Sequence, residues 1–149
     1  MSFRRLRVFH LALPGAFLMC LVVAAPTLAD GPQTQRVSVD SAGDQSNNHS
    51  GGPSISADGR YVAFASRASS LVRGDTNSSF DIFVRDRLRG VTRRVSVNSA
   101  EAEGKAGSSF EPSISADGRY VAFASGAGNL VGGDTNGSYD VFVRGPLPV

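Results

Sequence analysis

The feature that most constrains this chain is an internal duplication. Fourteen residues, PSISADGRYVAFAS, run from Pro53 to Ser66 and recur unchanged from Pro112 to Ser125. Each copy is followed by a similar segment, Leu71–Asp86 in the first and Leu130–Gly145 in the second. A repeat of this length cannot bury its own faces, so such units stack and share a core. The duplication therefore predicts two equivalent units, approximately residues 35–97 and 98–145.

Short apolar runs between turn residues predict strands throughout both units. The dipeptides Asp58-Gly59 and Asp117-Gly118 predict tight hairpins, because such turns need a positive φ. No long stretch after residue 29 has a helical period, so we expect an all-β fold. The predicted strands are Gln35–Val39, Ser54–Ser56, Arg60–Ser66, Asp81–Arg85, Thr92–Val97, Ser113–Ser115, Arg119–Ser125 and Asp140–Arg144.

The repeat begins before Pro53, because Arg36–Asp40 (RVSVD) matches Arg94–Asn98 (RVSVN). Each unit thus has four predicted strands, but the last unit lacks its fourth. The N-terminal segment is a spare copy of that missing strand. We expect it to complete the last unit.

The first 29 residues have the pattern of a secretory signal peptide: a basic start, an apolar stretch and Thr27-Leu28-Ala29 at the cleavage positions. This predicts a secreted or periplasmic protein; the alternative is an uncleaved membrane anchor. Twelve basic and thirteen acidic residues remain from Asp30 onward, a net charge of −1. Such a chain has no basic patch of the kind that binds nucleic acid. Its only cysteine is Cys20, so residues 30–149 must be stable without disulfides.

The duplicated residues resemble the repeat of TolB-type (WD-repeat-like) β-propellers. The resemblance lies in Pro53, Asp58-Gly59 and the apolar strand Tyr61–Ser66, and in the same positions of the second copy. It implies two four-stranded blades, although propellers usually have four to eight. Three explanations stay open: a fragment of a longer propeller, a unit that self-assembles (three copies giving six blades), or an open pair of blades.

Two loops carry the polar residues that come closest to a metal site. They run from Gly74 to Asp81 and from Gly133 to Asp140. Carboxylate and amide oxygens at this spacing suit Ca²⁺, although the loops are shorter than an EF-hand. The alternative is that these side chains only cap a turn and start the next strand. The candidate ligands are Asp75, Asn77, Asp81, Asp134, Asn136 and Asp140.

A catalytic constellation is missing from the sequence. His49 is the only histidine after the leader, and no Gly-x-Ser-x-Gly turn is present. We therefore expect no enzyme and, apart from Ca²⁺, no cofactor. The resemblance implies a non-catalytic module for protein–protein interaction. The alternatives are a carbohydrate-binding propeller assembled from several chains, with Phe80 and Tyr139 as contacts, and the truncated propeller of a larger hydrolase.

Overall fold

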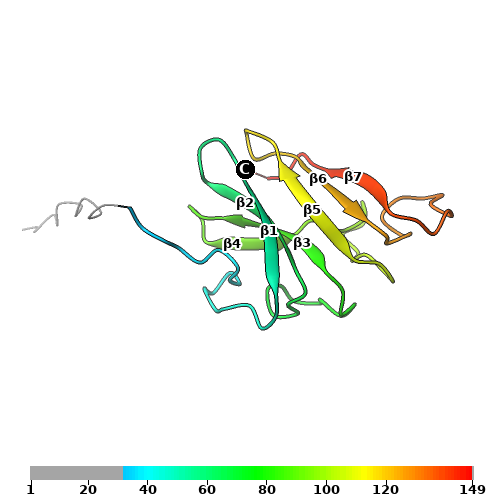
Figure 1. Ribbon diagram of the computed structural model, residues 1–149, viewed down its shortest axis with the longest axis horizontal. Coiled ribbons are helices and arrows are strands. Elements are labelled where there is room, and N and C mark those ends of the chain that lie inside the picture. The colour runs from blue at the N-terminus through cyan, green and yellow to red at the C-terminus, as the bar shows by residue number, and fades with distance from the viewer. Residues whose placement is uncertain (1–31, 149) are drawn as a thin grey trace, which may run out of the picture. The chain divides into compact units, whose positions relative to one another are not determined.

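The structure, a computed structural model, describes residues 32–148, and within that range it contains strands and no helix. The strands are β1 (Ser50–Ile55), β2 (Tyr61–Ser66), β3 (Asp81–Asp86), β4 (Val91–Arg94), β5 (Ser109–Ile114), β6 (Val121–Ser125) and β7 (Asp140–Arg144). They form two antiparallel sheets, ordered β1-β2-β3-β4 and β5-β6-β7 (Figure 1). The predicted all-β class is confirmed. Because the described part has no helix, it has none that could span a bilayer.

Both sheets belong to one compact unit, Thr34–Val149. The remaining unit, Met1–Gln33, falls almost wholly outside the described residues, and so does the predicted signal peptide at residues 1–29.

The Asp-Gly hairpins form where the sequence predicts them. Gly59 and Gly118 have φ values of 71° and 73°, which residues other than glycine rarely adopt. Asp58 accepts hydrogen bonds from Ser56 Oγ at 2.6 Å and from the Arg60 backbone N–H at 3.0 Å. Asp117 accepts the equivalent pair. These two aspartates therefore stabilise turns.

The first strand of each sheet is longer than predicted, and the two strands are irregular at the same place. The register of β1 against β2 shifts between Gly51 and Ser54, and that of β5 against β6 shifts between Phe110 and Ser113. An extra residue in one strand bends it and increases its twist. The repeat thus preserves the shape of the sheet as well as its sequence.

The main core lies between the two sheets. Small residues on one face of the first sheet let the second sheet approach closely, as the alternation of sizes in β2 suggests. The first sheet contributes Tyr61, Ala63, Ala65, Ile82 and Val84, and the second contributes Ile114, Val121 and Phe123. Val95, just after β4, and Ala127 and Leu130, in the loop after β6, complete the core. The opposite face of the first sheet has its own small cluster, built of Phe64, Ala68, Leu71 and Phe83.

One predicted strand is wrong. Gln35–Val39 belongs to neither sheet, and only Val39 makes an isolated bridge, to Gln45. The physical reason is that this segment lies away from β7, the strand that it was expected to complete. The second sheet therefore has three strands, and β7 is its open edge (Figure 1). Two four-stranded blades within one chain are not observed.

Candidate functional site

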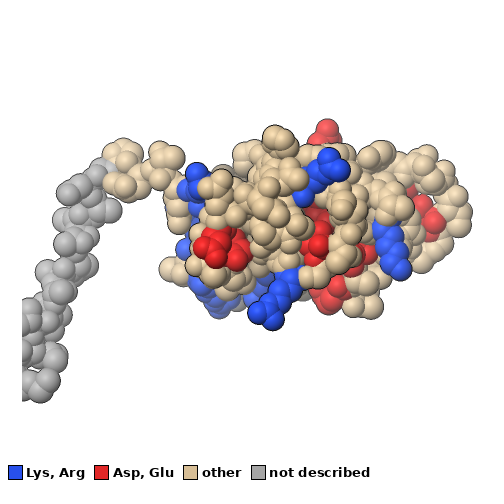
Figure 2. Space-filling view, turned by 90° about the horizontal axis from the view of Figure 1, so that it is seen from below, with Lys and Arg blue, Asp and Glu red and all other residues tan. Residues whose placement is uncertain are grey.

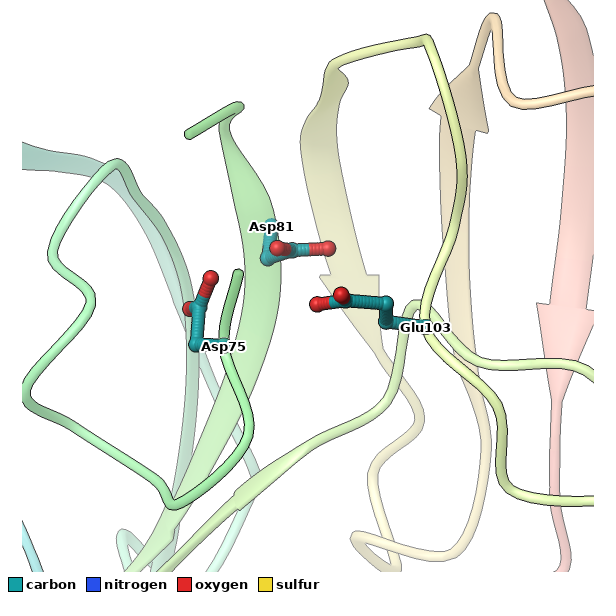
Figure 3. A group of neighbouring side chains, drawn as sticks. All are labelled: Asp75, Asp81 and Glu103. Carbon is teal, nitrogen blue, oxygen red and sulfur yellow. The ribbon is translucent and has the colours of Figure 1, made fainter. Parts of the chain in front are cut away.

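Three carboxylates gather where the loop before β3 meets the loop between β4 and β5. They belong to Asp75, at the end of a turn, Asp81, at the start of β3, and Glu103 (Figure 3). One oxygen of each lies within 4.8 Å of the other two. The structure thus brings together two of the predicted metal ligands and adds Glu103, which was not predicted.

Arg94, the last residue of β4, is the cation of this cluster. Its Nη1 lies 2.7 Å from Glu103 and 3.6 Å from both aspartates, and its side chain is only 9% exposed. The buried Nε of Arg94 has no hydrogen-bond partner. Arg94 therefore stands beside all three carboxylates, where a bound cation would have to compete with it.

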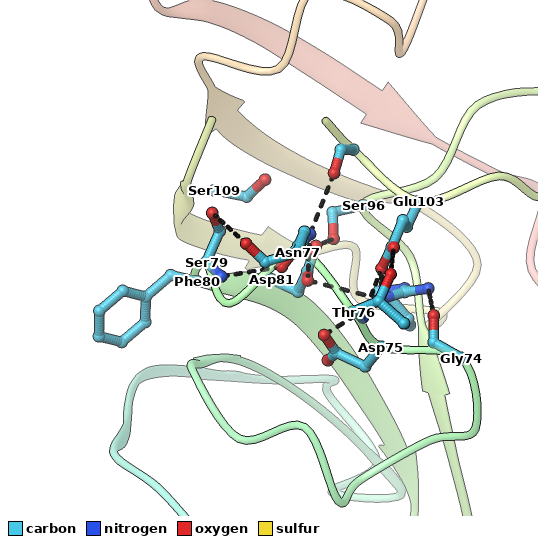
Figure 4. Close-up of polar contacts among 12 residues, drawn as sticks. Gly74, Asp75, Thr76, Asn77, Ser79, Phe80, Asp81, Ser96, Glu103 and Ser109 are labelled. Carbon is cyan, nitrogen blue, oxygen red and sulfur yellow. Dashed lines mark hydrogen bonds and ion pairs between the residues drawn. The ribbon is translucent and has the colours of Figure 1, made fainter. Parts of the chain in front are cut away.

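Asn77 and Ser96 hold Asp81 in place (Figure 4). The Asn77 amide nitrogen donates to Asp81 at 2.9 Å, while its oxygen accepts from the Ser79 backbone. Ser96 Oγ donates to Asp81 at 2.5 Å. Asn77 thus points its nitrogen, not its oxygen, at the cluster, which suits turn capping better than metal ligation. The calcium site stays a prediction.

Burial is the main influence on the pKa values of the aspartates in this cluster, and the neighbouring carboxylates act in the same direction. Burial, together with the charges of Asp81 and Glu103, raises the pKa of Asp75 to about 6. Burial also raises the pKa of Asp81 above its usual range. Burial acts in the same direction on Glu103, but hydrogen bonds from Thr76 and the charge of Arg94 outweigh it and lower that pKa. One carboxyl of the three therefore takes up a proton most readily, and it is that of Asp75.

The second unit holds only half of this arrangement. Asn136 donates to Asp140 at 3.1 Å and accepts from the Ser138 backbone, as Asn77 does with its own neighbours. Asp134 and Asp140 are partly exposed. The equivalents of Arg94 and Glu103 would have to come from a following unit, and the described chain ends before one begins.

The two predicted ligand-contact residues have different environments. Phe80 is partly buried against the main core, and Tyr139 is 60% exposed. Phe110 lies between them, with ring centroids 5.2 Å from Phe80 and 6.4 Å from Tyr139. The structure thus links both residues in one aromatic row through Phe110, which was not predicted.

The other candidate site is an apolar surface that we call the open face of the second sheet. It consists of Tyr120, Ala122, Ala124, Val141 and Val143, which the register of β6 and β7 places on one side of the sheet. Val141 and Val143 are 79% and 68% exposed. Large exposed apolar side chains that adjoin one another indicate a contact surface.

On the face shown in Figure 2, charged residues of one sign do not gather in a single patch. Figure 2 shows Lys, Arg, Asp and Glu interspersed on the side of the molecule seen there. The expectation that nucleic acid is not a partner stays a prediction.

Comparison with known proteins adds no family. None of the protein-family models matches the chain, and no curated protein matches its sequence.

Proposed function

We propose that this chain is an exported, non-catalytic module of the TolB-type β-propeller kind that acts by binding protein through the open face of its second sheet. The observation that carries the proposal is the exposure of Val141 and Val143 beside the unpaired edge of β7. An unpaired edge offers backbone hydrogen bonds, and an apolar face offers burial; proteins that bind by adding a strand use both.

The residues themselves support a scaffold more than a catalyst. The clustered carboxylates already contact Arg94, and Asp58 and Asp117 serve turns. The propeller part of the proposal rests on the duplicated sequence and on the two similar sheets. The sheets pack face to face, as adjacent blades of a propeller do.

The test is affinity capture from the exported fraction of the native host with three baits. The first is the unchanged protein, the second carries Val141→Lys and Val143→Lys, and the third carries Leu88→Lys. Leu88 is 77% exposed in the turn after β3 and lies off the open face. We expect the first and third baits to retain a protein that the second loses. Equal capture by all three would reject the open face as the binding surface.

A second function, carbohydrate binding, is favoured by the aromatic row of Phe80, Phe110 and Tyr139. Tyr139 is exposed and the other two rings are partly buried, so the row offers one free aromatic face on which the apolar face of a sugar ring could stack. A glycan array probed with the unchanged protein and with Tyr139→Ala tests this function. Binding that the substitution removes would support it, and an array without hits would reject it.

A further inference from the structure

We propose that copies of this chain join head to tail, with Arg36–Ser46 of one copy completing the second sheet of the next copy beside β7. We call Arg36–Ser46 the donor segment. This inference rests on the proposed function, because it names the protein that covers the open face: a second copy of the same chain. It is drawn from what the equivalent segment, Arg94–Gly104, does within one chain.

The donor segment is already folded like Arg94–Gly104. Arg36 Nη1 donates to Gln45 Oε1 at 2.5 Å, as Arg94 Nη1 does to Glu103 at 2.7 Å. The isolated bridge from Val39 to Gln45 has its counterpart in a bridge from Val97 to Glu103. The donor segment therefore needs no refolding to act as its counterpart does.

The turn within each segment is also the same. The Oδ1 of Asp40 accepts from the backbone N–H groups of Ala42 and Asp44 at 2.9 and 2.8 Å. In the same way, the Oδ1 of Asn98 accepts from the backbone N–H groups of Ala100 and Ala102, at 2.9 and 3.0 Å. The repeat thus extends from sequence to conformation at a place where no sheet imposes it.

Each segment contacts the sheet that follows it in the same way. Arg85 donates to the Asp40 carbonyl oxygen at 2.7 Å, and Arg144 donates to the Asn98 carbonyl oxygen at 3.2 Å. Arg85 and Arg144 occupy the same position in β3 and β7. Both segments are therefore placed as the last strand of a preceding unit, and for the donor segment no such unit is found among residues 32–148.

Within the chain, β4 (Val91–Arg94) completes the first sheet beside β3, and Val95 and Ser96 continue that contact beyond the end of β4. Val95 N donates to the Ile82 carbonyl oxygen at 2.8 Å, and Ile82 N donates to Ser96 Oγ at 3.1 Å. Ser96 Oγ in turn donates to Asp81. The equivalents of Val95 and Ser96 in the donor segment are Val37 and Ser38.

The second sheet has the matching groups on its open edge. Val141 and Asp140 stand in β7 where Ile82 and Asp81 stand in β3. Between copies, Val37 N would donate to the Val141 carbonyl oxygen, and Ser38 would bridge Val141 and Asp140. This bonding would satisfy the backbone groups that β7 turns away from β6.

The half-built acidic site supports the same occupant. Asp134 and Asp140 lack the equivalents of Arg94 and Glu103, and the donor segment holds those equivalents, Arg36 and Gln45, already bound to each other. The completed site would contain two carboxylates beside one arginine. This site would have one negative charge in excess, whereas the site of Asp75, Asp81, Glu103 and Arg94 has two when all three carboxyls are ionised.

The open face would be covered at the same time. In the chain, the Tyr61 ring packs so closely on Gly118 that an added Cβ would lie 2.2 Å from it. Tyr120, the equivalent of Tyr61, is 43% exposed. Gly59, the equivalent of Gly118, has no ring on it: the atom nearest to an added Cβ would be 3.7 Å away. Tyr120 of one copy therefore has its matching surface on the first sheet of another.

The surfaces that meet are different, so the contact is head to tail and repeats until a ring closes or a filament grows. Since each chain brings two sheets, two to four copies would make a ring of about four to eight blades, the range that propellers adopt.

The first experiment measures the mass of the purified protein in solution by light scattering over a range of protein concentrations. The N-terminal residue of the same sample is determined, so that the mass of one chain is known. We expect a multiple of the chain mass for the unchanged protein and for Leu88→Lys, and a monomer for Val141→Lys with Val143→Lys. A monomer for the unchanged protein at every concentration would overturn the inference. That result would leave the proposed function intact if the affinity capture described above still retains a different protein that the Val141→Lys and Val143→Lys bait loses.

The second experiment identifies the strand that pairs with β7. Val84 faces Arg93 across β3 and β4, so the equivalent pair between copies is Val143 and Gln35. In a Cys20→Ser background, we would mix a Val143→Cys protein with a Gln35→Cys protein and add a short bis-maleimide. We expect a crosslinked dimer in the mixture and little in either protein alone. A dimer from one variant alone, or none in the mixture of an oligomeric protein, would show a different interface and overturn the inference.

Discussion

The two sheets share most of their residues and differ in what covers them. In the first sheet the face of Tyr61, Ala63, Ala65, Ile82 and Val84 is at most 6% exposed, because the second sheet packs on it. In the second sheet the equivalent positions form the open face. The position of a repeat unit in the stack, rather than its residues, thus decides whether this face is buried or exposed. Four predictions test this contrast.

The largest effect compares one substitution at two equivalent positions. Ile82→Lys places a charge at a fully buried site between the sheets and should cost about 4 kcal/mol or more, enough to unfold many domains. Val141→Lys, at a site 79% exposed, should change the stability by no more than about 0.5 kcal/mol. Urea unfolding at low protein concentration measures both. Equal losses would mean that the open face is buried in the single chain.

The second prediction concerns an ion pair found in the first sheet only. Arg60 donates to both oxygens of Asp86, at 3.0 and 2.7 Å, and so lowers the pKa of Asp86 to about 2. In the second sheet Gly145 replaces Asp86. We expect Asp86→Asn to cost about 1.5 kcal/mol at pH 7. We expect Arg119→Gln, at the position equivalent to Arg60, to have no measurable effect.

The pH dependence of this pair has a definite sign. Because the pKa of Asp86 is lower in the folded chain than the usual 3.8, its stabilisation is present above pH 3.8 and is lost as the pH falls through about 2. The difference between Asp86→Asn and the unchanged protein should therefore shrink over that interval. A difference that stays constant from pH 7 to pH 2 would contradict the role of the charge.

The third prediction concerns the complete and the half-built acidic site. Asp75→Asn removes one negative charge beside Asp81 and Glu103 and should stabilise the chain by about 1 kcal/mol at pH 7, after allowance for solvent screening. Asp134→Asn, where the other acidic loop is incomplete, should change little. Unfolding followed at several pH values measures both variants.

The sign again follows from the pKa. Asp75 has a folded-state pKa of about 6, above its usual 3.8, so the stability that its protonated form provides is fully present below pH 3.8 and lost as the pH rises through 6. The advantage of Asp75→Asn should consequently vanish as the pH falls from 6 to 4. A destabilised Asp75→Asn at pH 7 would mean that the attraction of Arg94 for the charged Asp75 carboxylate outweighs its burial and its repulsion by Asp81 and Glu103.

The duplicated residues predict most of the fold, because hairpin and strand are local consequences of an Asp-Gly turn followed by alternating side chains. The start of β1 at Ser50 is harder to predict. Ser50 and Gly51 have little strand propensity and become extended by pairing with Ser66 and Ala65. Gly52 has a φ of 59° and lies where the register shifts. The segment Gln35–Val39 fails as a strand for the opposite reason: it has the propensity but no partner strand.

The acidic site was half predictable from the sequence. Asp75, Asn77 and Asp81 recur in both units, so the repeat draws attention to them. Glu103 does not recur, since Gln45 occupies its equivalent position, and it reaches the cluster from a different loop. Arg94 recurs as Arg36, but nothing in the spacing shows that it contacts three carboxylates. Contacts between units depend on how the sheets stack, which local sequence does not encode.

The smallest expected effect is that of calcium on the unchanged protein. A cation at Asp75, Asp81 and Glu103 must displace the guanidinium of Arg94, which lies 2.7 Å from Glu103 and is almost buried. The Asn77 amide oxygen, the remaining predicted ligand, is bound to the Ser79 backbone. We therefore expect no change in melting temperature when Ca²⁺ is added after chelator treatment. A ligand that binds only the folded chain adds about 4.1 kcal/mol at a thousand times its Kd, so millimolar Ca²⁺ at a site of micromolar Kd would raise the melting temperature measurably. Such a rise, absent in Asp75→Asn and present in Asp134→Asn, would show that the complete site binds calcium in spite of Arg94.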